Sequence, residues 1–300
     1  MEQGEYRRLV APLGVPTWLI ADDPRLLAAA VAACPTSEHA DSGNGIEIRL
    51  EIASTPSSNL SCRIEVEGSR IRVTGADFAG VAEADARSGR CFVPQRLVDD
   101  PLLLAAELLD PILLFLLTRS GRTPLHAAGI VIDGTAVLLS GPGGSGKSSL
   151  AHAAARRGLP ILSDDTVYVQ LQPRFRFWGL PGPIHLLPGD APPGDHGIRL
   201  RGGRSKAAVG VPPGGTRSNA DQAILVLLER GGAVPVLTPM MPSDATAALA
   251  KLEPGFDLLP EQSAAVAEAL VAAGAWKLTL SSRPDEAIDC LLAELPRHDP

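Results

Sequence analysis

The chain has few of the residues that build disulfide frameworks or structural metal sites. Its four cysteines, Cys34, Cys62, Cys91 and Cys290, show none of the paired spacings of zinc ligands. The N-terminal residues MEQGEYRRLV lack the apolar stretch of a secretion signal. A reducing compartment fits these absences, and the sequence predicts a cytoplasmic protein.

Excess positive charge and long apolar runs are also missing. The net charge is −7, so the broad basic surface that nucleic-acid binding requires is not expected. The most apolar run, from Leu102 to Leu117, carries Glu107, Asp110 and Pro111, and a membrane span would need about 20 apolar residues without such interruptions. We therefore expect no nucleic-acid partner and no membrane span, and we interpret this run as a buried helix kinked or divided at Pro111.

The first hundred residues predict a small unit in which nothing suggests chemistry. Residues 22–34 have a capping Asp, Pro24 in a starting position and many Ala and Leu residues, which indicates a helix. Residues 46–52, 62–68 and 70–75 alternate apolar with polar side chains, which predicts half-buried antiparallel strands.

A different pattern begins after residue 118. Residues 128–140 predict two strands joined by a two-residue turn at Asp133-Gly134. A Gly-rich loop comes next, and then an Ala-rich helix over 148–157 that ends at a glycine. We expect a small α+β domain over residues 1–97, with a substrate or assembly role, followed by an α/β domain over residues 98–300.

The Gly-rich loop GPGGSGKS matches the P-loop pattern G-x-x-x-x-G-K-[ST]. Glycines let the main chain approach phosphate oxygens, a Lys supplies positive charge, and a Ser hydroxyl can coordinate Mg²⁺. Because the loop follows an apolar strand and opens a helix, backbone amides can surround the phosphates. We expect ATP and Mg²⁺ to bind here, with Ser148 as a metal ligand, through Gly141, Gly143, Gly144, Ser145, Gly146, Lys147, Ser148 and Ser149.

Residues 125–165 resemble the catalytic domain of HPr kinase/phosphorylase, and still more the smaller HPr-kinase-related proteins, including those that phosphorylate lasso-type precursor peptides. A His before a strand hairpin, the P-loop, and a double Asp after the next strand carry the resemblance. It implies the α/β P-loop kinase fold of the HPr-kinase C-terminal type, a mixed sheet with flanking helices. It also implies transfer of the γ-phosphoryl group of ATP to a Ser/Thr hydroxyl of a peptide or small protein, and it allows a homo-oligomer.

The resemblance also implies roles for residues around the P-loop. By position, His126 assists catalysis together with Lys147, and Asp165 accepts the proton of the substrate hydroxyl. A carboxylate at the end of a strand next to the P-loop strand can take a proton or orient Mg²⁺, and Asp164 is the candidate metal ligand. Successive strand residues point to opposite faces, so the two Asp side chains should not share one role. Which of them is the base and which is associated with the metal stays open.

Farther along the chain, Lys206 and Arg217 match a family segment in which a Lys-containing strand precedes an Arg needed for transfer. Arg217 is therefore the candidate catalytic arginine. Ser149 stands where bifunctional family members carry Glu, so we expect kinase activity without phosphorylase activity. Two alternatives remain: a regulatory module that binds ATP without transferring phosphate, and a small-molecule kinase whose acceptor binds the Arg-rich stretch at 199–206.

Overall fold

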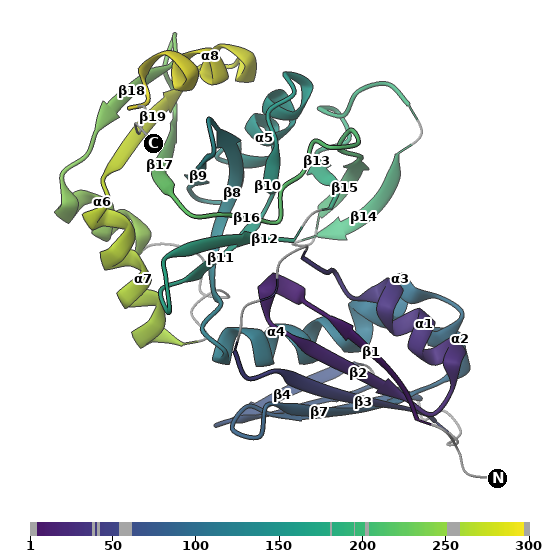
Figure 1. Cartoon of the computed structure of the whole chain (residues 1–300). Coiled ribbons are helices and arrows are strands. Elements are labelled where there is room, and N and C mark those ends of the chain that lie inside the picture. The colour runs from purple at the N-terminus through teal and green to yellow at the C-terminus, as the bar shows by residue number, and fades with distance from the viewer. Residues whose placement is uncertain are drawn as a thin grey trace. The chain divides into compact units, whose positions relative to one another are not determined.

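The computed structural model divides the chain into two compact units, Met1–Arg122 and Thr123–Pro300 (Figure 1). The structure describes residues 5–37, 40, 43–53, 62–180, 182–194, 196–201, 204–250 and 259–296, and the side chains of 199–201 and 204 lie outside that description. The division falls later than the predicted boundary at residue 97. The reason is that the apolar helices after residue 97 pack on the sheet of the N-terminal unit.

The N-terminal unit is a seven-stranded sheet with helices packed against it. The strand order is β1-β2-β3-β7-β6-β5-β4. A short 3₁₀ turn, Pro12–Gly14, separates the first two strands. The strands are β1 (Tyr6–Val10), β2 (Thr17–Ala21), β3 (Ile46–Ile52), β4 (Arg63–Glu67), β5 (Arg70–Thr74), β6 (Ala79–Glu83) and β7 (Ser88–Val93).

The sequence predicts an antiparallel strand at residues 46–52, and this prediction is wrong. β3 pairs in parallel with both β2 and β7. The helix α1 (Pro24–Ala33) returns the chain to the end of the sheet where β2 began, so β3 runs in the same direction as β2. The helix itself begins as predicted: the Asp23 carboxylate accepts hydrogen bonds from the amides of Arg25 (2.7 Å) and Leu26 (3.3 Å).

The apolar run forms one helical stretch, Pro101–Arg119, after the short helix α2 (Gln95–Val98). It consists of α3 (Pro101–Leu104), a π-helical segment (Ala105–Leu109) and α4 (Asp110–Arg119). Pro111 is the second residue of α4, directly after the π-helical segment, and its missing amide leaves one hydrogen bond of the continuous stretch unmade. The sequence predicts a kink or a division at Pro111, and the structure has a change from π-helical to α-helical winding there.

In the part of the chain that the structure describes, this stretch is the one helix long and apolar enough to cross a membrane. Core helices of other proteins pass the same test, so a single such helix is weak support for a span. Leu108 and Ile112 are fully buried, and they approach so near to Gly80 that a Cβ there would lie 2.8 Å from Leu108. The stretch is a core helix of the N-terminal unit.

The C-terminal unit contains a nine-stranded mixed sheet. Its order is β16-β12-β11-β8-β9-β17-β19-β18, with β10 paired to β8 beside that path. β9, β17 and β19 are mutually parallel, and the remaining pairs are antiparallel. The strands are β8 (Thr123–Ile132), β9 (Thr135–Ser140), β10 (Ile161–Ser163), β11 (Thr166–Gln170), β12 (Arg176–Gly179), β16 (Asn219–Ala220), β17 (Ala223–Arg230), β18 (Val236–Pro239) and β19 (Ala275–Leu280).

Helices cover both faces of this sheet (Figure 1). On one face lie α5 (Lys147–Arg156), α8 (Pro284–Glu294) and a small second sheet of β13 (Ile184–Leu186), β14 (Gly197–Arg201) and β15 (Arg204–Val209). On the other face lie α6 (Pro242–Leu249) and α7 (Pro260–Ala272). Alternate residues of β9 serve the two cores, Val137 and Leu139 toward α5 and Leu138 toward α7. The prediction of a mixed sheet with flanking helices is confirmed.

Candidate functional site

The P-loop and the predicted acidic pair reach the same edge of the large sheet. The loop follows the last residue of β9, Ser140, which pairs with Ala127 of β8. β8 runs antiparallel to β9, so His126 near its start lies at the edge where β9 ends. β10 in turn runs antiparallel to β8 and ends there with Asp164 and Asp165. The sequence predicts that the acidic pair follows a strand next to β9, the P-loop strand. In the structure the pair follows β10, and β8 lies between β9 and β10.

Two glycines give the P-loop a backbone shape that other residues rarely adopt. Gly144 and Gly146 have φ values of 82° and 111°. Gly146 caps α5, and it makes no side-chain capping bond to the amides of the first helical turn because it has no side chain. These amides have no carbonyl partner within the helix, so they can bind an anion.

Lys147 and Ser145 complete the loop. The Nζ atom of Lys147 is buried and donates hydrogen bonds to the carbonyl oxygens of Gly141 (2.6 Å) and Pro142 (3.2 Å). The hydroxyl of Ser145 is also buried, and it has no hydrogen-bond partner among the described residues. A buried ammonium and an unpartnered hydroxyl beside the amides of the first helical turn suit the oxygens of a nucleotide's phosphates. The loop residues therefore fit the predicted ligand.

The two Asp residues face different histidines. Oδ1 of Asp165 lies 3.8 Å from Nδ1 of His126, which is buried, and the Asp165 side chain is 35% exposed. Oδ2 of Asp164 accepts a hydrogen bond from the amide of His185 (2.8 Å) and lies 3.2 Å from Nδ1 of the same residue. The two carboxylates therefore lie in different environments, and their separate roles stay a prediction.

A serine orients the turn that carries both carboxylates. The hydroxyl of Ser163 accepts hydrogen bonds from the amides of Asp165 (3.4 Å) and Thr166 (3.2 Å). These contacts close a local turn between β10 and β11. Because both strands run antiparallel to β8, this turn is a bulge, and the chain continues beyond it in the same direction. The bulge sends the two carboxylates toward different histidines.

Sequence reasoning missed His185. This residue lies on β13, 21 positions after Asp164. The surrounding stretch is rich in Pro and Gly, and its strands are too short to show a periodic pattern in the sequence. A lone His carries no signal of its own. Only the pairing of β13 with β15 identifies its place next to the acidic turn.

Among the described residues, the side chain of the predicted arginine makes no hydrogen bond or ion pair with the P-loop. The amide of Arg217 donates to the carbonyl of Ile161 (2.9 Å), and the Arg217 side chain is exposed. Lys206 lies on β15 opposite residue 199. Within the described part of the chain, neither the Arg217 nor the Lys206 side chain makes a hydrogen bond or an ion pair. The side chains of 199–201 and 204, which the small-molecule alternative requires, lie outside the described residues.

The arginine beside the P-loop is Arg230, which ends β17. Its Nε atom lies 3.4 Å from the carbonyl oxygen of Ser145, and its Nη2 atom would lie 3.7 Å from a Cβ built on Gly146. Because β17 is parallel to β9, Arg230 projects at the same edge as the loop. Nothing in the local sequence marks this Arg among the many others of the chain.

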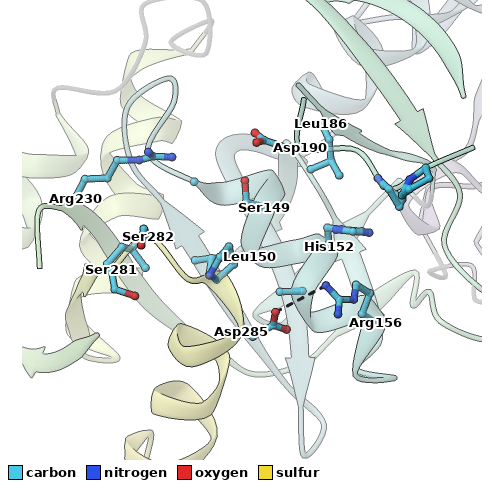
Figure 2. Close-up of a pocket in the computed structure, with 16 residues that line it drawn as sticks. Ser149, Leu150, His152, Arg156, Leu186, Asp190, Arg230, Ser281, Ser282 and Asp285 are labelled. Atoms are coloured by element: carbon cyan, nitrogen blue, oxygen red, sulfur yellow. Dashed lines mark ion pairs between the residues drawn. The ribbon is translucent and has the colours of Figure 1, made fainter. Parts of the chain in front are cut away.

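A cavity of about 610 Å³ opens beside the P-loop. One wall consists of residues spaced along α5, from Ser149 through His152 to Arg156, and the cavity reaches the loop at Gly146. Figure 2 shows Arg230 and Ser149 in one part of the cavity and Arg156 in another, where it forms an ion pair of 3.8 Å with Asp285. The volume falls in the range of about 300–1,000 Å³ that is common for small-molecule sites.

His152 gives this wall a neutral aromatic surface. Burial lowers the pKa of His152 below its ordinary value, and the positive charge of Arg156 lowers it further, while Asp285 acts in the opposite direction. Since the ordinary pKa is about 6.5, the ring is neutral at pH 7. The cavity therefore combines a neutral ring with charged lining side chains, an arrangement that suits a planar, partly polar ligand.

Comparisons with known proteins support a P-loop protein and no finer assignment. No protein-family model matches the chain. Over 174 residues it is 32% identical to the tRNA modification GTPase MnmE of Mesorhizobium japonicum, which covers 57% of this chain. The chain spans only about a third of the length of that curated relative, since the match covers 35% of it. The match supports a P-loop nucleotide-binding fold and no finer family.

A solved structure, that of the Hpr(Ser) kinase/phosphatase from Coxiella burnetii, also matches the chain. The match covers 57% of this chain and 93% of that one, at 15% sequence identity and a TM-score of 0.30. A TM-score this low carries no argument about fold or function. The geometry of the site is therefore the main basis for assigning a function to the chain.

Proposed function

We propose that this chain binds MgATP at the P-loop and transfers the γ-phosphoryl group to a Ser or Thr hydroxyl of a peptide or small protein. The observation that carries the proposal is the position of Asp165 and His126 at the same sheet edge as the loop. A carboxylate there is more than ATP binding alone requires, since the loop and its helix already provide for the phosphates.

The nucleotide would be bound by two parts of the site. The amides of the first turn of α5, together with Lys147 and Arg230, would hold the phosphates, and the part of the cavity along α5 would receive the nucleoside. Ser148 and Asp164 would hold Mg²⁺, which supplies charge neutralisation at the phosphoryl group. Mg²⁺ in such sites takes one or two protein ligands and completes its shell with phosphates and water, so no larger cluster of carboxylates is needed.

Asp165 suits the role of general base. With its side chain about one-third exposed, it can meet an incoming hydroxyl. In the transfer step the hydroxyl oxygen bonds to the γ-phosphorus, its proton passes to Asp165, and the bond from the γ-phosphorus to the bridging oxygen breaks to release ADP. The His126 ring beside Asp165 would keep the carboxylate in place.

The finer features of the sequence resemblance belong to the same proposal. These are the HPr-kinase type of the fold, kinase activity without phosphorylase activity on account of Ser149, a cytoplasmic location, and the capacity for a homo-oligomer. The N-terminal unit would then serve the substrate or the assembly. Nucleic acid and membrane are not among the proposed partners.

The decisive experiment is transfer of label from [γ-³²P]ATP to candidate acceptors, with Asp165→Asn as the test variant. General-base catalysis contributes about 10²- to 10⁴-fold, so this variant should bind ATP normally and lose that much turnover. Asp244→Asn, at an exposed position in the first turn of α6, is a matched control and should behave as wild type.

Each other outcome points elsewhere. Unchanged turnover in Asp165→Asn rules out this residue as the base. Tight ATP binding without transfer to any peptide, protein or metabolite favours a regulatory module. Label recovered on a metabolite and on no peptide makes the chain a small-molecule kinase.

A further inference from the structure

Asp164 is held by a residue that no sequence motif identifies. The amide and the ring of His185 both contact one carboxylate oxygen, Oδ2, at 2.8 Å and 3.2 Å, and neither contact uses Oδ1. The His185 side chain is 5% exposed and that of Asp164 is 12% exposed. Two contacts from one buried residue restrict the rotation of the Asp164 side chain much more than either would alone.

The position of His185 is itself fixed by a different sheet. β13 pairs antiparallel with β15, where His185 lies opposite Ala208. Ile184 and Leu186 on either side of it belong to the core beneath α5. The small sheet therefore connects the packing around α5 to the acidic turn after β10.

Only one nitrogen of the ring takes part in this contact. Nε2 of His185 is buried and has no hydrogen-bond partner in the described part of the chain. Nδ1 is the ring atom that contacts Asp164.

We propose that His185 is a positioning residue that presents the Asp164 carboxylate to the Mg²⁺ of MgATP. This inference rests on the proposed function, and it divides the labour between the two pairs: His185 with Asp164 serves the metal, and His126 with Asp165 serves the proton. Residues that orient a metal ligand typically change metal affinity or activity by about 10- to 100-fold when they are replaced.

Two isosteric variants test the proposal. In His185→Asn the side-chain amide can place an N–H near the position of Nδ1, whereas in His185→Gln the amide lies near the position of Nε2. The measurement is binding of a fluorescent, non-hydrolysable ATP analogue, first in EDTA and then with increasing MgCl₂. In EDTA both variants should bind as wild type does, because the P-loop is unchanged.

With magnesium the two variants should separate. His185→Asn should need nearly the same MgCl₂ concentration as wild type for half-maximal tightening, and His185→Gln should need about 10- to 100-fold more. If both variants need the same MgCl₂ concentration for half-maximal tightening, the role of His185 is overturned. This holds whether that concentration equals the wild-type value or is raised equally in both variants. Failure of the wild-type protein to bind the analogue at all is a separate result, because it contradicts the proposed function itself.

Discussion

Replacing Lys147 by Met tests the electrostatic basis of the P-loop. The change removes the ammonium and retains an unbranched apolar stem of similar length. In the free protein the buried Nζ atom donates to two carbonyl oxygens of the loop. When a nucleotide binds, the same ammonium would exchange these acceptors for charged phosphate oxygens.

The size of the effect depends on that exchange. A hydrogen bond to a charged group contributes about 1.5–3 kcal/mol, which corresponds to about a 10- to 150-fold increase in the Kd for ATP. The free protein loses two hydrogen bonds of about 1 kcal/mol each, and it is relieved of a buried charge. Folding should therefore survive the substitution while ATP binding weakens.

Calorimetric titration of ATP in excess MgCl₂ measures the change in Kd directly. Lys277→Met is the matched control, since the Lys277 ammonium is ion-paired with Glu229 at 3.2 Å on a neighbouring part of the same sheet. The control should bind ATP as wild type does. A Kd for Lys147→Met within threefold of the wild-type value, in a folded protein, would refute the assignment of phosphates to this loop.

Two further predictions address the cavity and the N-terminal unit. Arg230→Gln should weaken ADP and ATP about tenfold and leave adenosine unaffected, because the guanidinium borders the loop; equal losses for all three ligands in a binding titration would contradict a phosphate contact. A thiol reagent at pH 8 should label the exposed Cys62 in the folded protein and spare Cys34 and Cys91 until denaturant is added. Burial raises the pKa of the Cys34 and Cys91 thiols to about 12. At pH 8 their reactive thiolate is therefore about a thousandfold rarer than that of a thiol with an ordinary pKa of about 9. Comparable labelling rates for all three cysteines would show that the N-terminal unit is not packed as described.

The elements that the sequence predicted well are those with local chemical signals. The strand hairpin turns at Asp133 and Gly134, whose φ values of 48° and 84° suit only a few residue types. Helix α5 is followed by Gly158 with a φ of 78°, and Asp23 caps α1. Each signal depends on a handful of consecutive residues, so it is visible without knowledge of the rest of the chain.

Pairing between distant strands left no such signal. The parallel position of β3 depends on the crossover through α1. The short strands between residues 173 and 219 pair mostly with one another across irregular loops, and only β12 also pairs with β11 before that stretch. The C-terminal unit shows the same division at its site. The P-loop and the acidic pair were predictable as motifs, but His185 and Arg230 reach them only through strand order, which no spacing reveals.

The strand order also bears on the reaction. β8 lies between β9 and β10, so the acidic turn begins two strand positions from the P-loop. With about 4.8 Å between neighbouring strands, this sideways offset is about 9.6 Å. A carboxylate on an adjacent strand would leave little space for an acceptor. An offset of two strands leaves room for a γ-phosphoryl group and an incoming hydroxyl, and His126 at the start of β8 borders that space. The interposed strand therefore favours a base that meets a second substrate over a site that only retains a nucleotide.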